Sequence, residues 1–266
     1  MECMNKITGI IMAILLFSSC GNVPVTGRRQ LLLVSDAEVI SASLTQYNDY
    51  MKTATISANK TQSAMVERVG KNIAKATEAY LRQDGRENEI ANFSWEFVLV
   101  KSDEVNAFCM PGGKIVVYEG LLPLMASEDE LAVVVGHEVG HAVSKHSNER
   151  MSQALLAQFG ASIVNVALSK KSEAMQSVGN TVFGLGAQLG VMLPYSRTHE
   201  YEADYVGLVF MAMSGYNPGS ALAFWQKMSN LSGGGNTVDF LSTHPSDSKR
   251  IAEIQRRLPE VEKFRR

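Results

Sequence analysis

The run HEVGH at residues 137–141 places two histidines four positions apart, with a glutamate directly after the first. On an α-helix such residues are separated by about 40° and about 6 Å, so His137 and His141 project from one face. Two imidazoles on one face can bind a single metal ion. Glu138, one step around the helix, can reach a water molecule beside that ion without being a ligand. The spacing therefore predicts a zinc site that hydrolyses peptide bonds.

A third protein ligand is needed, because catalytic zinc usually takes three protein ligands and a water molecule. His146 follows His141 by about 140° on a continued helix, so we expect it to point away from the site. Glu200 and Asp204 lie four residues apart and share a face of a second predicted helix. We expect Glu200 to be the third ligand. We expect Asp204 to accept the free ring N–H of a ligand histidine, which fixes the tautomer of that ring.

Two further polar residues of the second helix are expected to face elsewhere. Glu202 lies on the side opposite Glu200. His199 is displaced from Glu200 by about 100°, which indicates a surface position for this histidine. If the run at 137–141 were absent, an exposed acidic helix turn would be the ordinary interpretation of this segment. The second helix thus contributes to the site only through one of its faces.

Mostly helical elements must position these residues. Apolar periodicity and capping signals predict helices over 36–83, 127–146, 197–213, 219–231 and 246–259. Two strand-like runs, at 93–100 and 114–118, predict a small sheet. The apolar, Gly-rich segment 151–193 has no stretch long enough to span a bilayer, and we interpret it as buried helices or as a hairpin that contacts a membrane or a partner. The predicted fold class is α+β and mostly α.

The N-terminus has the pattern of a targeting segment. Residues 7–17 form an apolar run that is too short to span a bilayer, and Ser18-Ser19-Cys20-Gly21 follows. This resembles a bacterial lipobox, in which the chain is cleaved before Cys20 and the cysteine carries lipid. An ordinary cleaved signal or an N-terminal anchor helix is the alternative. We expect a signal peptide at 1–19, a lipidated cysteine and tether at 20–35, and one metallopeptidase domain at 36–266.

Composition excludes several other classes. Of the 266 residues, 45% are hydrophobic and 20% are charged, which suits a globular domain rather than a disordered segment. The net charge of -2 gives no basic excess, so we expect no nucleic-acid partner. Cys109 is the single cysteine outside the expected signal and lipobox, which excludes an internal disulfide if Cys20 is acylated.

Motifs along nearly the whole chain resemble the gluzincin peptidase family that includes HtpX and the CaaX prenyl protease, and most of all its periplasmic lipoprotein members, such as LoiP and the catalytic part of BepA. In order they are Pro24–Gln30, Asn106–Phe108, Pro111–Gly113, the run 137–141, Ser196-Arg197 with Glu200–Asp204, and Thr243-His244-Pro245. The resemblance implies a zincin-type domain with one Zn²⁺ per chain. Its Glu-x-x-Ala-Asp pattern favours Glu200 over Glu202 as the ligand.

The same resemblance implies a role for His244 and for one strand. His244 resembles a latch that can occupy the open zinc position. It could instead donate a hydrogen bond to the oxyanion of the transition state, or simply lie at a helix entry. The strand at 114–118 resembles the edge strand that lies above the zinc site in zincins, where an extended peptide binds through backbone hydrogen bonds. A plain core strand is the alternative.

The function expected from these features is that of a zinc-dependent endopeptidase with Glu138, His244 and Asp204 as its catalytic group. We expect it in the bacterial periplasm, held by its lipid to the outer membrane, and acting on unfolded or misassembled polypeptides. One alternative is a largely latent, zinc-bound chaperone or assembly factor that works with outer-membrane assembly proteins. Another is a non-catalytic scaffold that binds partners through segment 151–193.

Overall fold

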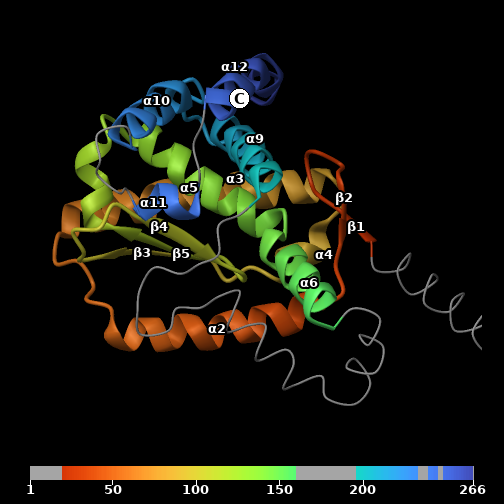
Figure 1. The fold of residues 1–266 in the computed structure, drawn as a ribbon. Helices are drawn as coiled ribbons and strands as arrows, with labels where there is room; N and C mark the ends of the chain where they lie inside the picture. Colours follow the sequence, from red (N-terminus) through yellow and green to blue (C-terminus); the bar gives the residue numbers. More distant parts are fainter. Residues whose placement is uncertain (1–19, 160–195, 233–238, 245–247, 266) are drawn as a thin grey trace, which may run out of the picture.

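The computed structural model of the chain describes residues 20–159, 196–232, 239–244 and 248–265 (Figure 1). The expected signal peptide and most of segment 151–193 lie outside the described residues. The elements in chain order are β1 (Cys20–Asn22), β2 (Arg29–Leu31), α2 (Asp36–Thr53), α3 (Lys60–Gln83), α4 (Glu87–Ile90), β3 (Glu96–Val100), β4 (Ala107–Met110), β5 (Lys114–Tyr118), η1 (Glu119–Leu124), α5 (Glu128–Val143), α6 (His146–Phe159), α9 (Arg197–Met213), α10 (Ser220–Ser232), α11 (Asp239–Thr243), α12 (Ser248–Val261) and η3 (Glu262–Phe264). The predicted α+β, mostly helical class is confirmed.

Two predicted helices end earlier than the sequence pattern indicated. The segment 36–83 forms α2 and α3, because Asn59 starts a new helix by accepting a hydrogen bond from the backbone N–H of Gln62. Helix α5 ends at Val143 rather than near residue 146. Lys145 then adopts a left-handed conformation with φ of 53°, and α6 begins at the next residue. A left-handed residue redirects the chain, so His146 does not continue the helix that carries His141.

The three-stranded sheet has the order β3-β5-β4, with β3 parallel and β4 antiparallel to β5. Strand β5 is therefore central, and the expectation that 114–118 forms the edge was wrong. Its side chains explain the placement. Ile115 and Val117 belong to the core shared with α3 and α5, whereas Val116 and Tyr118 belong to the core shared with α2. A strand buried on both faces belongs inside a sheet. The edge strand nearest α5 is β4.

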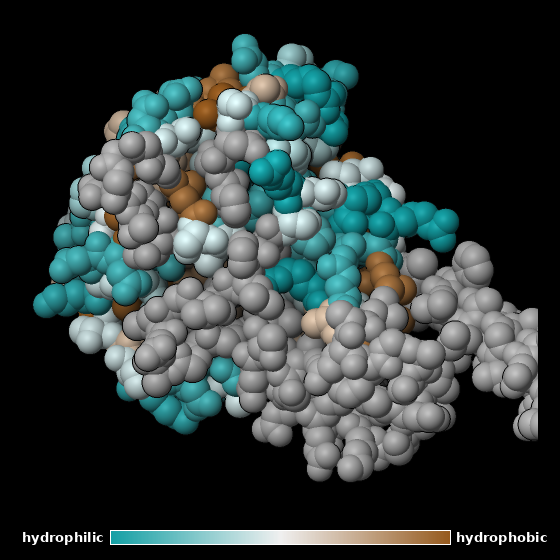
Figure 2. Space-filling view, viewed as in Figure 1, coloured by the Kyte–Doolittle hydropathy of each residue, from teal (hydrophilic) through white to brown (hydrophobic). Residues whose placement is uncertain are grey.

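Helices cover both faces of this sheet in Figure 1, with α2 on one face and α3 and α5 on the other. Most of α5 is buried, including both histidines of the run at 137–141. On the face shown in Figure 2 the described surface is mainly hydrophilic, with hydrophobic residues in small separate groups. Among the described residues no helix is both long and apolar enough to cross a membrane.

Helices α5 and α9 cross with their backbones almost in contact. A Cβ atom added at Gly140 would lie 2.5 Å from the carbonyl oxygen of Ala203, and one added at Gly207 would lie 2.6 Å from the carbonyl of Gly136. These separations are shorter than real Cβ contacts, so only glycine allows this approach. The crossing brings the two histidines of α5 to the acidic face of α9.

The N-terminal hairpin packs against α6 and α9. Strands β1 and β2 pair antiparallel, and the motif Pro24–Gln30 runs from the turn between them into β2. Val23 is completely buried. Arg28 forms ion pairs with Glu149 of α6 and Glu202 of α9, each at 2.7 Å. The segment 20–35, expected to be a tether, is thus attached to the helical domain along part of its length.

Candidate metal centre

Four buried residues bring their donor atoms together between α5, α9 and α11. His137 and His141 come from α5, Glu200 comes from α9, and His244 directly follows α11. One donor atom from each residue lies within 4.8 Å of the others, and each residue is at most 2% exposed. The structure therefore brings His137, His141 and Glu200 together as the spacing predicted, and adds His244 to the same group.

The distances between the donors suit a tetrahedral ion. His137 Nε2 lies 3.0 Å from His141 Nε2 and 3.4 Å from Glu200 Oε2, and His141 Nε2 lies 3.3 Å from Glu200 Oε1. Zinc bonds of about 2.0–2.1 Å in tetrahedral geometry imply donor-to-donor distances of about 3.3 Å. Imidazole nitrogens with one carboxylate oxygen also form an ordinary catalytic zinc set. The three residues therefore fit zinc in both chemistry and spacing.

His244 takes the fourth corner of this group. Its Nδ1 atom lies 3.1 Å from His137 Nε2 and 3.2 Å from each carboxylate oxygen of Glu200. Its Nε2 atom faces Glu138 Oε1 at 3.3 Å. The backbone N–H of Phe240, in the preceding helix, donates to the carbonyl oxygen of Val105, two residues before β4. The segment that carries His244 is thus tied to the loop that leads into the edge strand.

Glu138 stands beside the donor group but outside it. The side chain is 1% exposed, and burial raises its pKa to about 7. The backbone of Cys109 in β4 hydrogen-bonds the carboxylate. Oε1 makes no hydrogen bond to any other described residue. A buried acceptor of this kind next to a metal site is suited to receive a proton, since its pKa lies near neutral pH.

Asp204 contacts the outer side of one histidine ring. His137 Nδ1 lies 2.8 Å from Asp204 Oδ1, so the ring donates to the carboxylate and its Nε2 atom is left to face the donor group. Burial opposes ionisation of Asp204, yet the positive charge of Arg250 outweighs that effect and the pKa stays below its usual value. The sequence prediction had placed Asp204 in this relation to a ligand histidine without specifying which one.

Arg250 of α12 is the residue of the site that the sequence analysis missed. It is completely buried and donates to both carboxylate oxygens of Asp204, at 2.7 and 2.8 Å. Its Nη1 atom also lies 3.0 Å from Glu200 Oε2, and its guanidinium lies 3.4 Å above the ring of Trp225. A signal was present, because Arg250 shares the apolar stripe of α12 with Ile254.

The charges of this cluster are consistent with a divalent ion. Glu138, Glu200 and Asp204 carry three negative charges when ionised, and Arg250 supplies one positive charge in the same buried volume. Two uncompensated negative charges would be costly in a low-dielectric interior. A divalent cation bound by the donor group would neutralise them.

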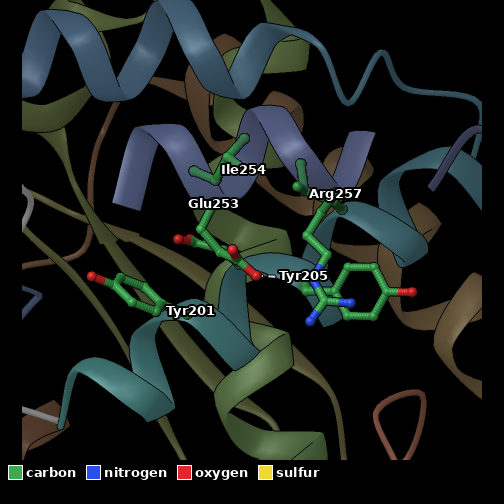
Figure 3. Close-up of a pocket in the computed structure, with 7 residues that line it drawn as sticks. Tyr201, Tyr205, Glu253, Ile254 and Arg257 are labelled. Atoms are coloured by element: carbon green, nitrogen blue, oxygen red, sulfur yellow. Dashed lines mark hydrogen bonds and ion pairs between the residues drawn. The ribbon is translucent and has the colours of Figure 1, made fainter. Parts of the chain in front are cut away.

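Arg250 is fixed by the packing of α12 on α9. A shallow pocket between these helices is lined by residues that include Tyr201, Tyr205, Glu253 and Arg257 (Figure 3). The guanidinium of Arg257 lies 4.5 Å from the Tyr205 ring centroid, and its Nε atom pairs with Glu253 at 3.0 Å. Asp204 also lines this pocket. The contact of Arg257 with Tyr205 joins α12 to α9 and holds α12 where Arg250 can reach the site.

Two histidines lie where the sequence analysis did not expect them. His199 is 3% exposed, with its Nε2 atom 3.1 Å from Glu149 Oε2, so the predicted surface position was wrong. The N-terminal hairpin and α6 cover that side of α9. His146 is completely buried, and its Nδ1 atom lies 2.8 Å from His141 Nδ1. It points toward the back of that ring because the chain turns at Lys145. Burial lowers the pKa of His146 to about 4, so the ring is neutral at pH 7.

Fold and site together define the class of this molecule. The mostly helical α+β fold carries a buried His/His/Glu/His group, and an edge strand lies next to it, as in zincin-type metallopeptidases. A model of Peptidase family M48 matches residues 60–258. The chain therefore belongs to peptidase family M48, which confirms the resemblance found in its motifs.

Three relatives illustrate the breadth of this family. The mitochondrial metalloendopeptidase OMA1 of Schizosaccharomyces pombe is 34% identical over 174 residues, covering 65% of this chain and 49% of that protein. OMA1 of Arabidopsis thaliana is 42% identical over 163 residues, covering 61% and 31%. The beta-barrel assembly-enhancing protease of Escherichia coli is 27% identical over 169 residues, covering 61% and 34%. This chain spans about half the length of these relatives or less.

Proposed function

We propose that this chain is a zinc-dependent endopeptidase, with His137, His141 and Glu200 as the ligands of one zinc ion and Glu138 as the general base. The observation that carries the proposal is the position of Glu138 Oε1. This buried acceptor makes no hydrogen bond among the described residues, faces the Nε2 atom of His244 at 3.3 Å, and stands beside three donors at tetrahedral spacing. Family membership and the names of the relatives support the same activity.

Each residue has a task in this reaction. Zinc bound here would lower the pKa of a water molecule to about 7 and polarise the peptide carbonyl. Glu138 accepts the proton of the attacking water and delivers it to the leaving amine, so no covalent intermediate with the protein is needed. Its pKa of about 7, raised by burial, suits both transfers at neutral pH. Asp204 holds the tautomer of His137 that leaves Nε2 free for the metal.

We assign His244 the role of a latch. Its Nδ1 atom fills the fourth corner of the donor group, which is the position that a water molecule needs. The alternative role, hydrogen bonding to the oxyanion, requires the ring beside that position rather than in it. The hydrogen bond between Phe240 and Val105 ties the latch segment to the neighbourhood of β4. Activity therefore requires that His244 moves.

The proposed substrate is an extended polypeptide that pairs with β4. This strand uses one edge to pair with β5, and its other edge faces the site, where the backbone of Cys109 contacts Glu138. An extended peptide bound there would be held by backbone hydrogen bonds, which carry little sequence information. Unfolded or misassembled proteins, whose backbones are accessible, fit such a site better than folded proteins do.

We further propose that the enzyme lies in the bacterial envelope, anchored by a lipid on Cys20 to the outer membrane. The lipobox-like residues before Cys20 support this placement. The name of the Escherichia coli relative, a beta-barrel assembly-enhancing protease, favours substrates or partners in the assembly of β-barrel proteins. A largely latent chaperone or assembly factor remains the second candidate, because His244 in the fourth position would keep proteolysis low.

Casein cleavage by the wild type and by Glu138→Gln separates the two candidates. Cleavage by the wild type that the variant lacks supports the endopeptidase, and little cleavage by either protein supports the latent chaperone. The full-length variant should bind zinc as the wild type does, because Glu138 is not among the donors. It should lose casein cleavage by about 10²–10⁴-fold, the usual contribution of a general base. Wild-type activity should disappear with a chelator and return with zinc. Glu67→Gln, on the exposed surface of α3, is the matched control.

Cleavage by Glu138→Gln near the wild-type rate would contradict the proposed mechanism. The same preparations test the proposed location, because both proteins should fractionate with membranes and lose that association when Cys20 is replaced. Recovery in the soluble fraction would rule out the lipid anchor. Envelope polypeptides trapped by the inactive variant would identify the substrate class.

A further inference from the structure

A second polar network lies behind the metal centre and is not used by the reaction described above. It joins α6 and α9 to the N-terminal hairpin. His146, Glu149, His199 and Glu202 are each at most 6% exposed. The rings of His146 and His199 stack with centroids 4.4 Å apart. Buried polar groups of this kind are costly unless each one is satisfied, so the network has a defined arrangement of donors and acceptors.

The hydrogen-bond directions in this network follow from the metal site. If His141 binds metal through Nε2, its proton is on Nδ1. That N–H then donates to His146 Nδ1, 2.8 Å away. His146 must therefore carry its own proton on Nε2, which lies 3.1 Å from Glu202 Oε2. In His141 and in His146, one ring nitrogen donates and the other accepts, so both rings are used fully in their neutral form.

Glu202 is in turn held by the N-terminal hairpin. The hydroxyl of Thr26 donates to Glu202 Oε1 at 2.5 Å, and Arg28 Nε donates to Glu202 Oε2 at 2.7 Å. The guanidinium of Arg28 also donates to both carboxylate oxygens of Glu149. These contacts come from a turn more than 170 residues away in sequence from Glu202. They fix the carboxylate that His146 contacts.

We propose that His146 is a positioning residue for the ligand His141, and that Glu202, held by Thr26 and Arg28, fixes His146. This inference rests on the proposed zinc site. The two histidine ligands are then oriented by different kinds of contact. Asp204 contacts His137 directly, whereas His141 is held through a second imidazole that ends on a carboxylate. Hydrogen bonds to the outer nitrogen of a ligand histidine fix its ring and raise its basicity. Docking of the N-terminal hairpin thereby contributes to metal affinity.

The test compares zinc affinities of full-length variants by competition with a chromophoric chelator. His146→Phe keeps a ring that can stack on His199 but removes both hydrogen bonds, and it should bind zinc about 10–100-fold more weakly than wild type. The matched control is His199→Phe, which removes a buried histidine from the same network but leaves the hydrogen bonds of His146 to His141 and Glu202 in place. It should bind zinc like the wild type, even if its thermal stability falls.

Two further variants test the geometry if His146→Phe fails to fold. Asn can place an acceptor near the position of Nδ1, whereas Gln extends to the position of Nε2. His146→Asn should therefore bind zinc more tightly than His146→Gln. Thr26→Val, which keeps the side-chain shape, should weaken zinc binding by a smaller factor than His146→Phe, since Arg28 still holds Glu202.

Equal zinc affinity of wild type and His146→Phe would overturn the inference, as would an equal loss in His199→Phe or equal affinities of the Asn and Gln variants. An unchanged affinity in Thr26→Val would overturn the part assigned to the hairpin. These outcomes are distinct from failure of the proposed function, in which the wild type itself would bind no zinc or Glu138→Gln would still cleave casein.

Discussion

The three proposed zinc ligands each have a second contact that holds the side chain in place. His137 is held by Asp204, His141 by His146, and Glu200 by Arg250. Such contacts reduce the freedom of the donors before metal binds, which favours a single coordination geometry. His244 is held differently, because it directly follows the five-residue helix α11 and its outer nitrogen, Nε2, faces Glu138 of the site itself. It is therefore the donor best placed to leave the group.

Replacing His244 by Ala should raise the rate of casein cleavage several-fold, because the fourth corner becomes available to a water molecule. Initial rates measured at saturating zinc would show this. The double variant His244→Ala with Glu138→Gln serves as the control and should be inactive, which shows that the added cleavage comes from this site. A loss of cleavage in His244→Ala alone would assign the ring to transition-state stabilisation and reject the latch.

The crossing of α5 and α9 decides whether the ligands meet. Glycines at positions 136, 140 and 207 allow the two backbones to touch, and this contact sets the distance between the histidines of one helix and Glu200 of the other. Gly140 lies inside the run at 137–141, and its lack of a side chain lets α5 approach Ala203 of α9. Small changes of helix separation should therefore act on metal binding.

Gly140→Ala should destabilise the protein by about 1–3 kcal/mol, because its Cβ atom would lie 2.5 Å from the carbonyl oxygen of Ala203. It should also weaken zinc binding, since the helices must separate. Val139→Ala is the matched control. It removes a buried side chain from the neighbouring position and costs about 2 kcal/mol without separating the helices. Urea unfolding and chelator competition measure the two effects, and unchanged zinc affinity in Gly140→Ala would contradict the argument.

At the scale of the whole molecule, ion pairs join the N-terminal hairpin to the helical domain. Arg28 contacts Glu149 and Glu202, which lie on different helices. Burial tends to raise the pKa of Glu149, but hydrogen bonds from His199 and Arg28 outweigh this and lower it from 4.5 to about 2. A carboxyl group whose pKa is lower in the folded state adds stability above its unfolded pKa and loses it as the pH falls through the folded value.

Glu149→Gln should therefore lower the free energy of unfolding at pH 7 by about 2 kcal/mol, the usual contribution of a hydrogen bond to a charged group. The difference from wild type should shrink between the unfolded value of 4.5 and pH about 2. Urea unfolding followed by tryptophan fluorescence at several pH values measures it. Glu67→Gln, in an exposed pair with Lys71, should change little at any pH. A pH-independent difference for Glu149→Gln would reject this linkage.

Local spacing was sufficient for much of the site. The positions of His137 and His141 follow from four-residue spacing on one helix, and Glu200 with Asp204 follows from the same rule on another. The helix over 197–213 was predicted with the bounds that the structure has. Helical periodicity shows which residues share a face, and it also separated Glu200 from Glu202. These features depend on contacts within one element, which is why the sequence alone indicated them.

Tertiary structure decided the rest. His146 turns back to His141 because a left-handed residue at Lys145 ends α5, which periodicity does not reveal. The contact of Arg250 with the site and the central position of β5 depend on which apolar faces pack together. A single sequence shows that a face is apolar but not which element packs against it. The sequence thus determined two pairs of residues and the chemistry they permit. Packing of α5 on α9, with α12 and the N-terminal hairpin around them, determined that the pairs meet and what holds them, because those contacts join segments far apart in the chain.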